Sequence, residues 1–433
     1  MWKVVLLALC VYANIPSIEG GSSPNSEYVK LLFGDSGARY SNNIIEDANL
    51  DVPGLVKKYG YPIEMHNVTT PDGYILGMHR IRHGRDANNV PDENKPVIFL
   101  MHGIVSSSAD WVIMGPGAGF AYILAEAGFD VWMGNARGNF YSRTHVRLNP
   151  DAILNTNYWK FSWDEIGNID LPTMIDYVLV KTNRQRLHYV GHSQGTTAFF
   201  VMNSLRPVYN DKIISMHALA PVAYMAHNRN TLLLFMAPMA NDVEKISSLM
   251  GIGELLPNNA IMSWAGQNLC MDESTFQPVC SNILFLIGGW NVEQLNKTMM
   301  PVIFGHSPAG SSVRQFVHYG QGIADKGFRR FDHGSRMANR KAYGSRRPPN
   351  YDLSKVTAPV FLHYSFNDPL AEVQDVERLF RELGRPVGKF LVPLPAFNHI
   401  DYIWAINAKE LIYDRVINLV RAVERSGIDN LVL

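Results

Sequence analysis

Short apolar runs alternate with segments of helical periodicity along two stretches of this chain. Apolar runs that end in glycine or polar residues predict strands at 97–104, 129–138, 186–193, 358–365 and 388–394. Helices are predicted at 115–128, 171–182, 194–205, 372–383 and 408–426. Strands that alternate with helices form βαβ units, so the pattern predicts an α/β fold with a mostly parallel sheet and helices on both faces.

Between 221 and 350 the alternation stops, and half of the chain's 18 methionines lie between 221 and 340. Residues 231–257 have the pattern of short amphipathic helices with breaks. An insertion of this length is too long for a loop without secondary structure or function of its own. We therefore expect a core at 46–220 and 351–433, and a helical cap at 221–350 that covers an apolar site.

The first twenty residues, MWKVVLLALCVYANIPSIEG, predict a signal peptide at 1–20, because a lysine precedes an apolar run. A polar lead at 21–45 follows, and we expect order to begin near Asp51. No later apolar run is long enough for a membrane span. The 39 basic and 39 acidic residues balance, which argues against nucleic acid as a partner.

After loss of a signal peptide, Cys270 and Cys280 are the remaining cysteines. Two cysteines close in sequence in an oxidising compartment predict one disulfide; the alternative is a pair of free buried thiols. Asn67 and Asn296 each begin an N-glycosylation sequon. These features together favour a secreted or lumenal protein.

The segment Gly191-His192-Ser193-Gln194-Gly195 stands where a predicted strand meets a predicted helix. G-x-S-x-G at such a junction is typical of a nucleophile elbow, in which the flanking glycines leave room for a strained turn. Ser307 begins a similar motif, but Pro308 follows it and has no N–H for an oxyanion. Ser36 lies too near the N-terminus, with no histidine before it.

In a hydrolase with such an elbow, the acid and then the histidine follow the serine along the chain. Asp368 follows the strand predicted at 358–365, and His399 is the only histidine beyond it. Asp375 and Asp401 are alternative acids, and Asp368 could instead cap the next helix. We expect backbone N–H groups of Gln194 and Ile104 to hold the oxyanion, and His102 to be structural.

Beyond G-x-S-x-G, several segments resemble the acid lipase family of gastric, lysosomal and insect lipases, from about residue 45 to 425. They include HGIVSSSADW, DVWMGNARGN, FSWDEIGNIDLPTMIDYV, LHYVGHSQGTT and NHIDYIWA. The resemblance implies the α/β-hydrolase fold with an inserted cap and a cap disulfide at Cys270 and Cys280. It implies Ser193, Asp368 and His399 as the triad and Gln194 and Ile104 as oxyanion donors. The chain departs from the family in Ser365-Phe366 before the acid, Pro369 after it, and Ala136 in place of serine.

The resemblance implies hydrolysis of neutral lipid esters, such as triacylglycerols and in some members cholesteryl esters, at a lipid–water interface. Neither the motifs nor the resemblance implies a metal or organic cofactor. Two alternatives remain open: a carboxylesterase for smaller soluble esters that uses the same residues, and an inactive lipid-binding protein on a hydrolase fold. The destination, secreted or lysosomal, and the oligomeric state do not follow from the sequence.

Overall fold

The computed structural model describes residues 42–431 except 153–154, 259–268, 271–273 and 275–276. The predicted signal peptide at 1–20, Ser36 and most of the lead at 21–45 lie outside the described residues. Order begins earlier than Asp51, because helix α3 (Asn42–Asn49) precedes α4 (Val52–Lys58). The polar pattern misses α3 because tertiary packing holds it: α3 packs closely on α13 (Met300–His306), far along the chain.

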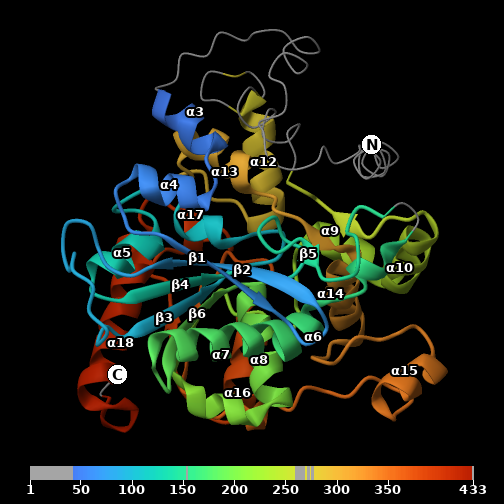
Figure 1. Ribbon diagram of the computed structural model, residues 1–433. Helices are drawn as coiled ribbons and strands as arrows, with labels where there is room; N and C mark the ends of the chain where they lie inside the picture. Colours follow the sequence, from blue (N-terminus) through green and yellow to red (C-terminus); the bar gives the residue numbers. More distant parts are fainter. Residues whose placement is uncertain (1–41, 153–154, 259–268, 271–273, 275–276, 432–433) are drawn as a thin grey trace.

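Within the described residues, nine strands form one sheet in the order β1-β2-β4-β3-β6-β7-β10-β11, with β5 paired to β2. Its strands are β1 (Glu64–Thr69), β2 (Tyr74–Ile81), β3 (Val97–Met101), β4 (Asp130–Gly134), β5 (Thr144–His145), β6 (Leu187–His192), β7 (Ile213–Leu219), β10 (Val360–Tyr364) and β11 (Pro386–Leu391). Figure 1 shows strands β1 to β4 and β6 of this sheet side by side in the middle of the molecule. Neighbouring strands from β4 to β11 pair in parallel, whereas β1, β2 and β5 add an antiparallel part. The predicted α/β fold with a mostly parallel sheet is confirmed.

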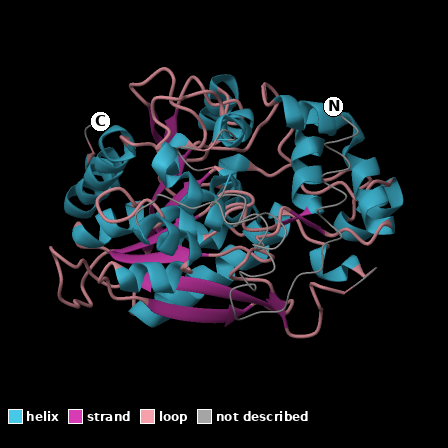
Figure 2. Cartoon of the chain, turned by 90° about the horizontal axis from the view of Figure 1, so that it is seen from above, coloured by secondary structure: helices cyan, strands magenta, loops and turns pink. Residues whose placement is uncertain are grey.

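Strands β3, β4 and β6 are buried at every position. A strand covered on both faces has no exposed side, so none of the three alternates between apolar and polar residues; β3 is apolar throughout, and β4 is apolar after Asp130. The helices that pack on the sheet are α5 (Phe120–Glu126), α7 (Leu171–Thr182), α8 (Gln194–Leu205), α16 (Val373–Glu382) and α18 (Asp414–Ser426); the shorter α6 (Trp163–Glu165) and α17 (Asp401–Trp404) lie in the connections. Helices α7, α8 and α16 lie together on one side of the sheet, and α5 and α18 on the other (Figure 1). A view from above shows helices on either side of the strands (Figure 2).

Between β7 and β10, none of the described strands joins the main sheet. This stretch forms α9 (Thr231–Met236), α10 (Ala240–Leu249), α12 (Gln277–Gly288), α13, α14 (Val313–Asp325) and α15 (Arg336–Tyr343), with a small pair of strands, β8 (Glu254–Leu255) and β9 (Ser311–Ser312). The predicted disulfide between Cys270 and Cys280 is confirmed. Throughout the described ranges, no helix combines the length and the apolarity that crossing a bilayer requires.

Candidate active site

Ser193 stands in the turn between the end of β6 and the start of α8. Its backbone has φ 52° and ψ −117°, a conformation that side-chain-bearing residues rarely adopt. Strain of this kind persists only where the surrounding structure enforces it, and it is typical of functional sites. The turn places the serine at the carboxyl end of a central parallel strand, where ligands bind in open α/β sheets.

The two glycines of the motif make this turn possible by their lack of a side chain. A Cβ atom added at Gly195 would lie 2.3 Å from the carbonyl oxygen of Met101 at the end of β3. A Cβ atom at Gly191 would lie 2.7 Å from the carbonyl carbon of Gly195. Both neighbours are backbone atoms and cannot rotate away. The glycines therefore let strand β6, helix α8 and the end of β3 approach one another around Ser193.

Ser193, His399 and Asp368 form one hydrogen-bonded chain. The Nε2 atom of His399 lies 2.7 Å from the Oγ atom of Ser193. The Nδ1 atom of the same ring lies 2.8 Å from Oδ2 of Asp368. All three side chains are buried, and they come from loops that follow β6, β10 and β11. The carboxyl ends of three parallel strands thus bring together residues that lie up to 206 positions apart.

The Asp368 carboxylate is held in its ionised form. Burial alone would raise its pKa, but the neighbouring His399 and the backbone N–H groups of Ala371 and Leu370 outweigh burial and lower it. Both N–H groups donate to Oδ1 at 2.8 Å. An ionised carboxylate accepts a hydrogen bond from Nδ1–H of His399. The imidazole then presents an unprotonated Nε2 to the serine hydroxyl.

The two alternative acids do not contact the His399 ring. The Asp375 carboxylate, within α16, accepts hydrogen bonds from the backbone N–H and Nδ1 of His227. Asp401 accepts from the backbone N–H of Asn398 and from the side chain of Asn291. Among the three predicted candidates, Asp368 is the one in the serine–histidine chain.

His192, which precedes the serine, contacts the histidine loop, and sequence reasoning missed this contact. Its Nε2 lies 2.8 Å from the backbone oxygen of His399. Burial lowers the pKa of His192 to about 3, with a contribution from nearby His399, so the ring is neutral. A neutral ring that donates from Nε2 fixes the His399 peptide. Its position inside the motif, next to Ser193, is the sequence signal that could have indicated this role.

The loop after β3 lies directly against the serine. A Cβ atom added at Gly103 would lie 3.3 Å from Cβ and 3.7 Å from Oγ of Ser193. His102 is structural, as predicted: Nδ1–H donates to the Gly103 oxygen at 2.7 Å, and Nε2 accepts from the Ala136 N–H at 3.0 Å. Burial lowers the pKa of His102 to about 4, which keeps this pattern of one donor and one acceptor.

The contact of His102 also orients the peptide that follows Gly103. This peptide bond is trans, so the N–H of Ile104 points opposite to the Gly103 carbonyl that His102 holds. The Gln194 N–H belongs to the first turn of α8, where backbone donors have no partner within the helix. The two backbone donors named from the sequence therefore belong to the two segments that flank Ser193.

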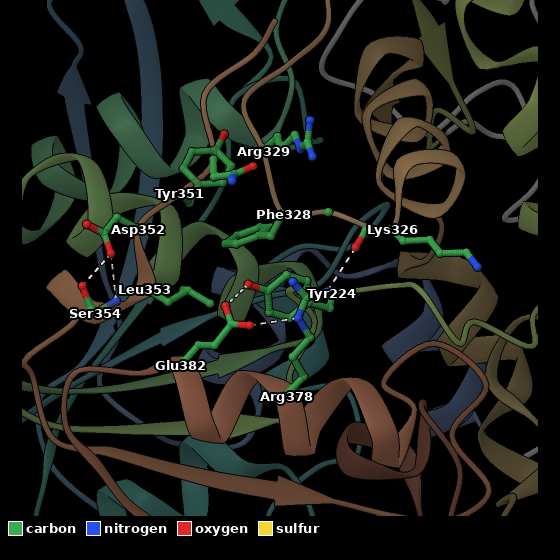
Figure 3. A pocket seen from close by; sticks show the side chains of 12 residues that line it. Tyr224, Lys326, Phe328, Arg329, Tyr351, Asp352, Leu353, Ser354, Arg378 and Glu382 are labelled. Carbon is green, nitrogen blue, oxygen red and sulfur yellow. Dashed lines mark hydrogen bonds and ion pairs between the residues drawn. The ribbon is translucent and has the colours of Figure 1, made fainter.

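A cavity of about 440 Å³ lies elsewhere in the molecule (Figure 3). It is lined by residues such as Phe328, Leu353 and Glu382, and Arg378 lies over the ring of Tyr224 inside it. Leu353 precedes β10 and Glu382 ends α16, which places the cavity near the amino end of β10. The triad lies at the opposite, carboxyl end of that strand. This cavity is therefore separate from the serine–histidine–aspartate site.

Comparison with known proteins agrees with this geometry. Residues 52–115 match the family model of a partial alpha/beta-hydrolase lipase region, and residues 96–246 match the alpha/beta hydrolase fold. A putative lipase from Sulfolobus solfataricus shares the fold, with a TM-score of 0.56 at 14% identity over 83% of this chain and 94% of that one.

Much closer sequence relatives exist. Lipase 3 of Drosophila melanogaster is 45% identical over 84% of this chain and 91% of its own length. Gastric triacylglycerol lipase of Rattus norvegicus is 36% identical over 86% and 92% of the two chains. Lysosomal acid lipase/cholesteryl ester hydrolase of Homo sapiens is 37% identical over 87% and 92%. The chain therefore belongs to the family of α/β-hydrolase lipases that includes the gastric and lysosomal acid lipases.

Proposed function

We propose that this enzyme hydrolyses carboxylic esters of neutral lipids, triacylglycerols and cholesteryl esters, through an acyl-enzyme on Ser193. The observation that carries the proposal is the hydrogen-bonded chain from Ser193 through His399 to Asp368. The names of the relatives, a triacylglycerol lipase and a cholesteryl ester hydrolase, support the substrate class. Hydrolysis by such a chain needs no metal or organic cofactor.

In the first half of the reaction, His399 takes the proton of the Ser193 hydroxyl as the serine oxygen attacks the ester carbonyl. Asp368 stabilises the imidazolium that forms. The oxyanion of the tetrahedral intermediate accepts hydrogen bonds from the N–H groups of Gln194 and Ile104, each of which contributes about 3 kcal/mol by the measured cost of deleting such donors. The imidazolium then gives its proton to the departing alcohol.

In the second half, a water molecule replaces the alcohol. His399 takes a proton from the water as it attacks the acyl-enzyme, and a second tetrahedral intermediate forms in the same oxyanion hole. Its collapse releases the fatty acid and returns the proton from His399 to Ser193. The lowered pKa of Asp368 supports this cycle, because the carboxylate remains available to hold the ring throughout.

The helices of 221–350 would serve as a cap over this site. In support, the hydroxyl of Tyr319 on α14 lies 3.1 Å from that of Thr197 on α8, the helix that begins after the nucleophile. The outer surface of α9 and α10 exposes apolar side chains such as Phe235, Ile246 and Leu249. Exposed apolar groups of this kind fit a partner that is itself apolar, such as a lipid–water interface.

The same proposal includes a secreted or lysosomal location. The disulfide between Cys270 and Cys280 supports it, because such bonds persist in oxidising compartments. Asn67 lies exposed on β1, which would leave it accessible to glycosylation, and Asn296 is half-buried. N-terminal sequencing of the secreted protein and removal of glycans by an endoglycosidase would test these features.

A fluorophosphonate probe tests the nucleophile. The wild-type enzyme should be labelled at Ser193, and Ser193→Ala should lose both the label and ester hydrolysis. His399→Ala should retain the fold by circular dichroism and lower kcat by at least about 1,000-fold, because the general base is gone. Labelling that persists in Ser193→Ala would assign the chemistry to another serine.

A substrate panel tests the substrate class. Rates on an emulsion of long-chain triacylglycerol, a cholesteryl ester dispersion and a soluble butyrate ester are compared between pH 4 and 8. A lipase should favour the long-chain substrates above the concentration at which an interface forms. Preference for the soluble ester would indicate a carboxylesterase, and absence of turnover on all three with an unlabelled Ser193 would indicate a lipid-binding protein.

A further inference from the structure

Residues 288–291, the last residue of α12 and the three that follow it, contact both loops that carry the proposed acid and base; we call this segment the strap. Three of its four carbonyl oxygens accept hydrogen bonds from these loops. The Gly288 oxygen accepts from the backbone N–H of His399 at 2.8 Å. The Gly289 and Trp290 oxygens accept from the side chains of Asn398 and Asn367, each at 2.8 Å. One short segment thus links the two catalytic loops.

The strap ends in a buried side-chain contact. Nδ2 of Asn291 donates to Oδ2 of Asp401 at 2.6 Å, and both residues are buried. The same oxygen of Asp401 accepts the backbone N–H of Asn398 at 2.8 Å. The Asn398 N–H belongs to the peptide between Phe397 and Asn398, so this side-chain oxygen of Asp401 fixes the chain one residue before His399. It does so while it is itself held by the strap.

Steric fit adds to these hydrogen bonds. Gly289 has φ +99°, and a Cβ atom there would lie 2.5 Å from the carbonyl oxygen of Asn367, next to Asp368. A Cβ atom at Gly288 would lie 2.9 Å from the side chain of Ile400, which follows His399. The strap therefore packs against both catalytic loops with no space for a side chain at either glycine.

We propose that Asn291 and Asp401 are positioning residues of the reaction: their hydrogen bond ties the strap to the His399 loop and holds the imidazole between Ser193 and Asp368. This inference rests on the proposed function of the triad. Neither side chain touches the reacting atoms, so both act through the backbone around His399. A displacement of about 1 Å in a reacting group can cost about 100-fold in rate, which sets the scale of the expected effect.

The experiment compares Asn291→Ala, Asp401→Ala and Asp401→Asn in the full-length enzyme. Asp401→Ala removes the acceptor oxygen and should lower kcat per active site 10- to 100-fold, with KM on a soluble ester unchanged. Asp401→Asn keeps an oxygen that can accept both N–H groups, and should stay within about 3-fold of wild type. Asn291→Ala should lower kcat at least 5-fold, and the double variant with Asp401→Ala should be no worse than Asp401→Ala alone.

Titration of active sites with a fluorophosphonate separates positioning from simple stability. If the two residues only stabilise the fold, the titratable fraction and Tm fall, whereas kcat per titrated site stays at the wild-type value; that outcome overturns the inference. Equal rates for Asp401→Ala and Asp401→Asn would also overturn it. If Asp401→Ala does not fold, Asn291→Ala tests the inference alone, because it removes the donor of the same hydrogen bond.

Asn282→Ala is the matched control, because Asn282 is an exposed asparagine on the same helix, α12, that leads into the strap. It should equal wild type in kcat, KM and titratable fraction. Failure of the proposed function is distinguishable: in that case wild-type Ser193 is unlabelled, or Ser193→Ala stays active. If those two controls behave as expected while Asn291→Ala matches Asn282→Ala, only the positioning role fails.

Discussion

At the scale of single residues, the site depends on how closely the backbone approaches itself around one serine. The end of β3, the β6–α8 turn and the first turn of α8 meet where Gly191 and Gly195 have no side chains. The strained conformation of Ser193 is therefore a consequence of packing between segments, and any added atom at these glycines must move the backbone near the reacting hydroxyl.

Gly195→Ala tests this interpretation. The new Cβ atom would lie 2.3 Å from the Met101 oxygen, a backbone atom two residues before Gly103 at the oxyanion side of the site. We expect a loss of at least about 100-fold in kcat/KM and a destabilisation of about 1–3 kcal/mol. Gly322→Ala on α14 is the control, since its nearest neighbour would be 3.5 Å away. Wild-type rates in Gly195→Ala would contradict the steric argument.

Chain order and local motif were enough to name Ser193, Asp368 and His399, because each follows a recognisable strand. The strap was not predictable in this way. Asn291 and Asp401 are 110 positions apart, and nothing in either local pattern indicates that they meet. The Gly288-Gly289 pair before Trp290 was the available signal, because two adjacent glycines mark a turn or a close approach.

At the scale of elements, the pattern predicted the central helices best. Helix α8 begins and ends at the predicted residues, and it ends just before Pro207. Helix α7 ends at the predicted Thr182, where Asn183 adopts the left-handed conformation, but its helical backbone continues upstream through a π-helical segment, Ile166–Asp170, to α6. The helix predicted at 115–128 forms only as α5, since Gly115 and Gly117 have positive φ and the helix starts after Gly119. The pattern did not single out β1, because its exposed positions include the apolar Met65 while its less exposed positions include the polar Glu64 and His66, so apolar and polar residues do not follow burial along the strand.

A buried ion pair links several of these elements. Arg137, in the loop after β4, donates to Asp170 just before α7 and to Asp72 in the turn between β1 and β2. The arginine and Asp170 are almost completely buried, and the guanidinium lies 4.0 Å from the centre of the Tyr74 ring. The fold therefore depends on this cation to satisfy a carboxylate that water cannot reach.

Arg137→Met should lower the free energy of unfolding by about 3–5 kcal/mol, because it leaves Asp170 buried without its partner. Urea unfolding followed by circular dichroism measures the change. Arg385→Met is the matched control: Arg385 pairs with Asp429 at an exposed site, where such pairs contribute about 0–1 kcal/mol. Similar losses in the free energy of unfolding for the two variants would show that burial does not determine how much the Arg137 pair stabilises the fold.

At the scale of the whole molecule, buried ionisable groups couple stability to pH. Burial raises the pKa of Asp110, in the turn Ser108–Trp111, to about 7, while a hydrogen bond from Ser106 acts in the opposite direction. Buried histidines act with the opposite sign: burial lowers the pKa of His318 and His363 to about 3. Unfolding frees these histidines to bind protons below pH about 6.5, so they reduce stability in acid.

A comparison of the wild type with Asp110→Asn isolates the contribution of the Asp110 carboxyl to the pH dependence of stability, because the two proteins contain the same histidines. Between pH about 4 and 7, the folded state binds a proton at Asp110 that the unfolded state has released, so this group makes stability fall as pH rises, by at most about 1.4 kcal/mol per pH unit. Asp110→Asn cannot titrate, and the stability of wild type relative to this variant should decline from pH 5 to 7 and level off above. Urea unfolding of both proteins at pH 5, 6, 7 and 8 measures this difference, with Asp211→Asn at an exposed site as control. A difference that stays constant over this range would mean that Asp110 is already ionised in the folded protein at pH 5.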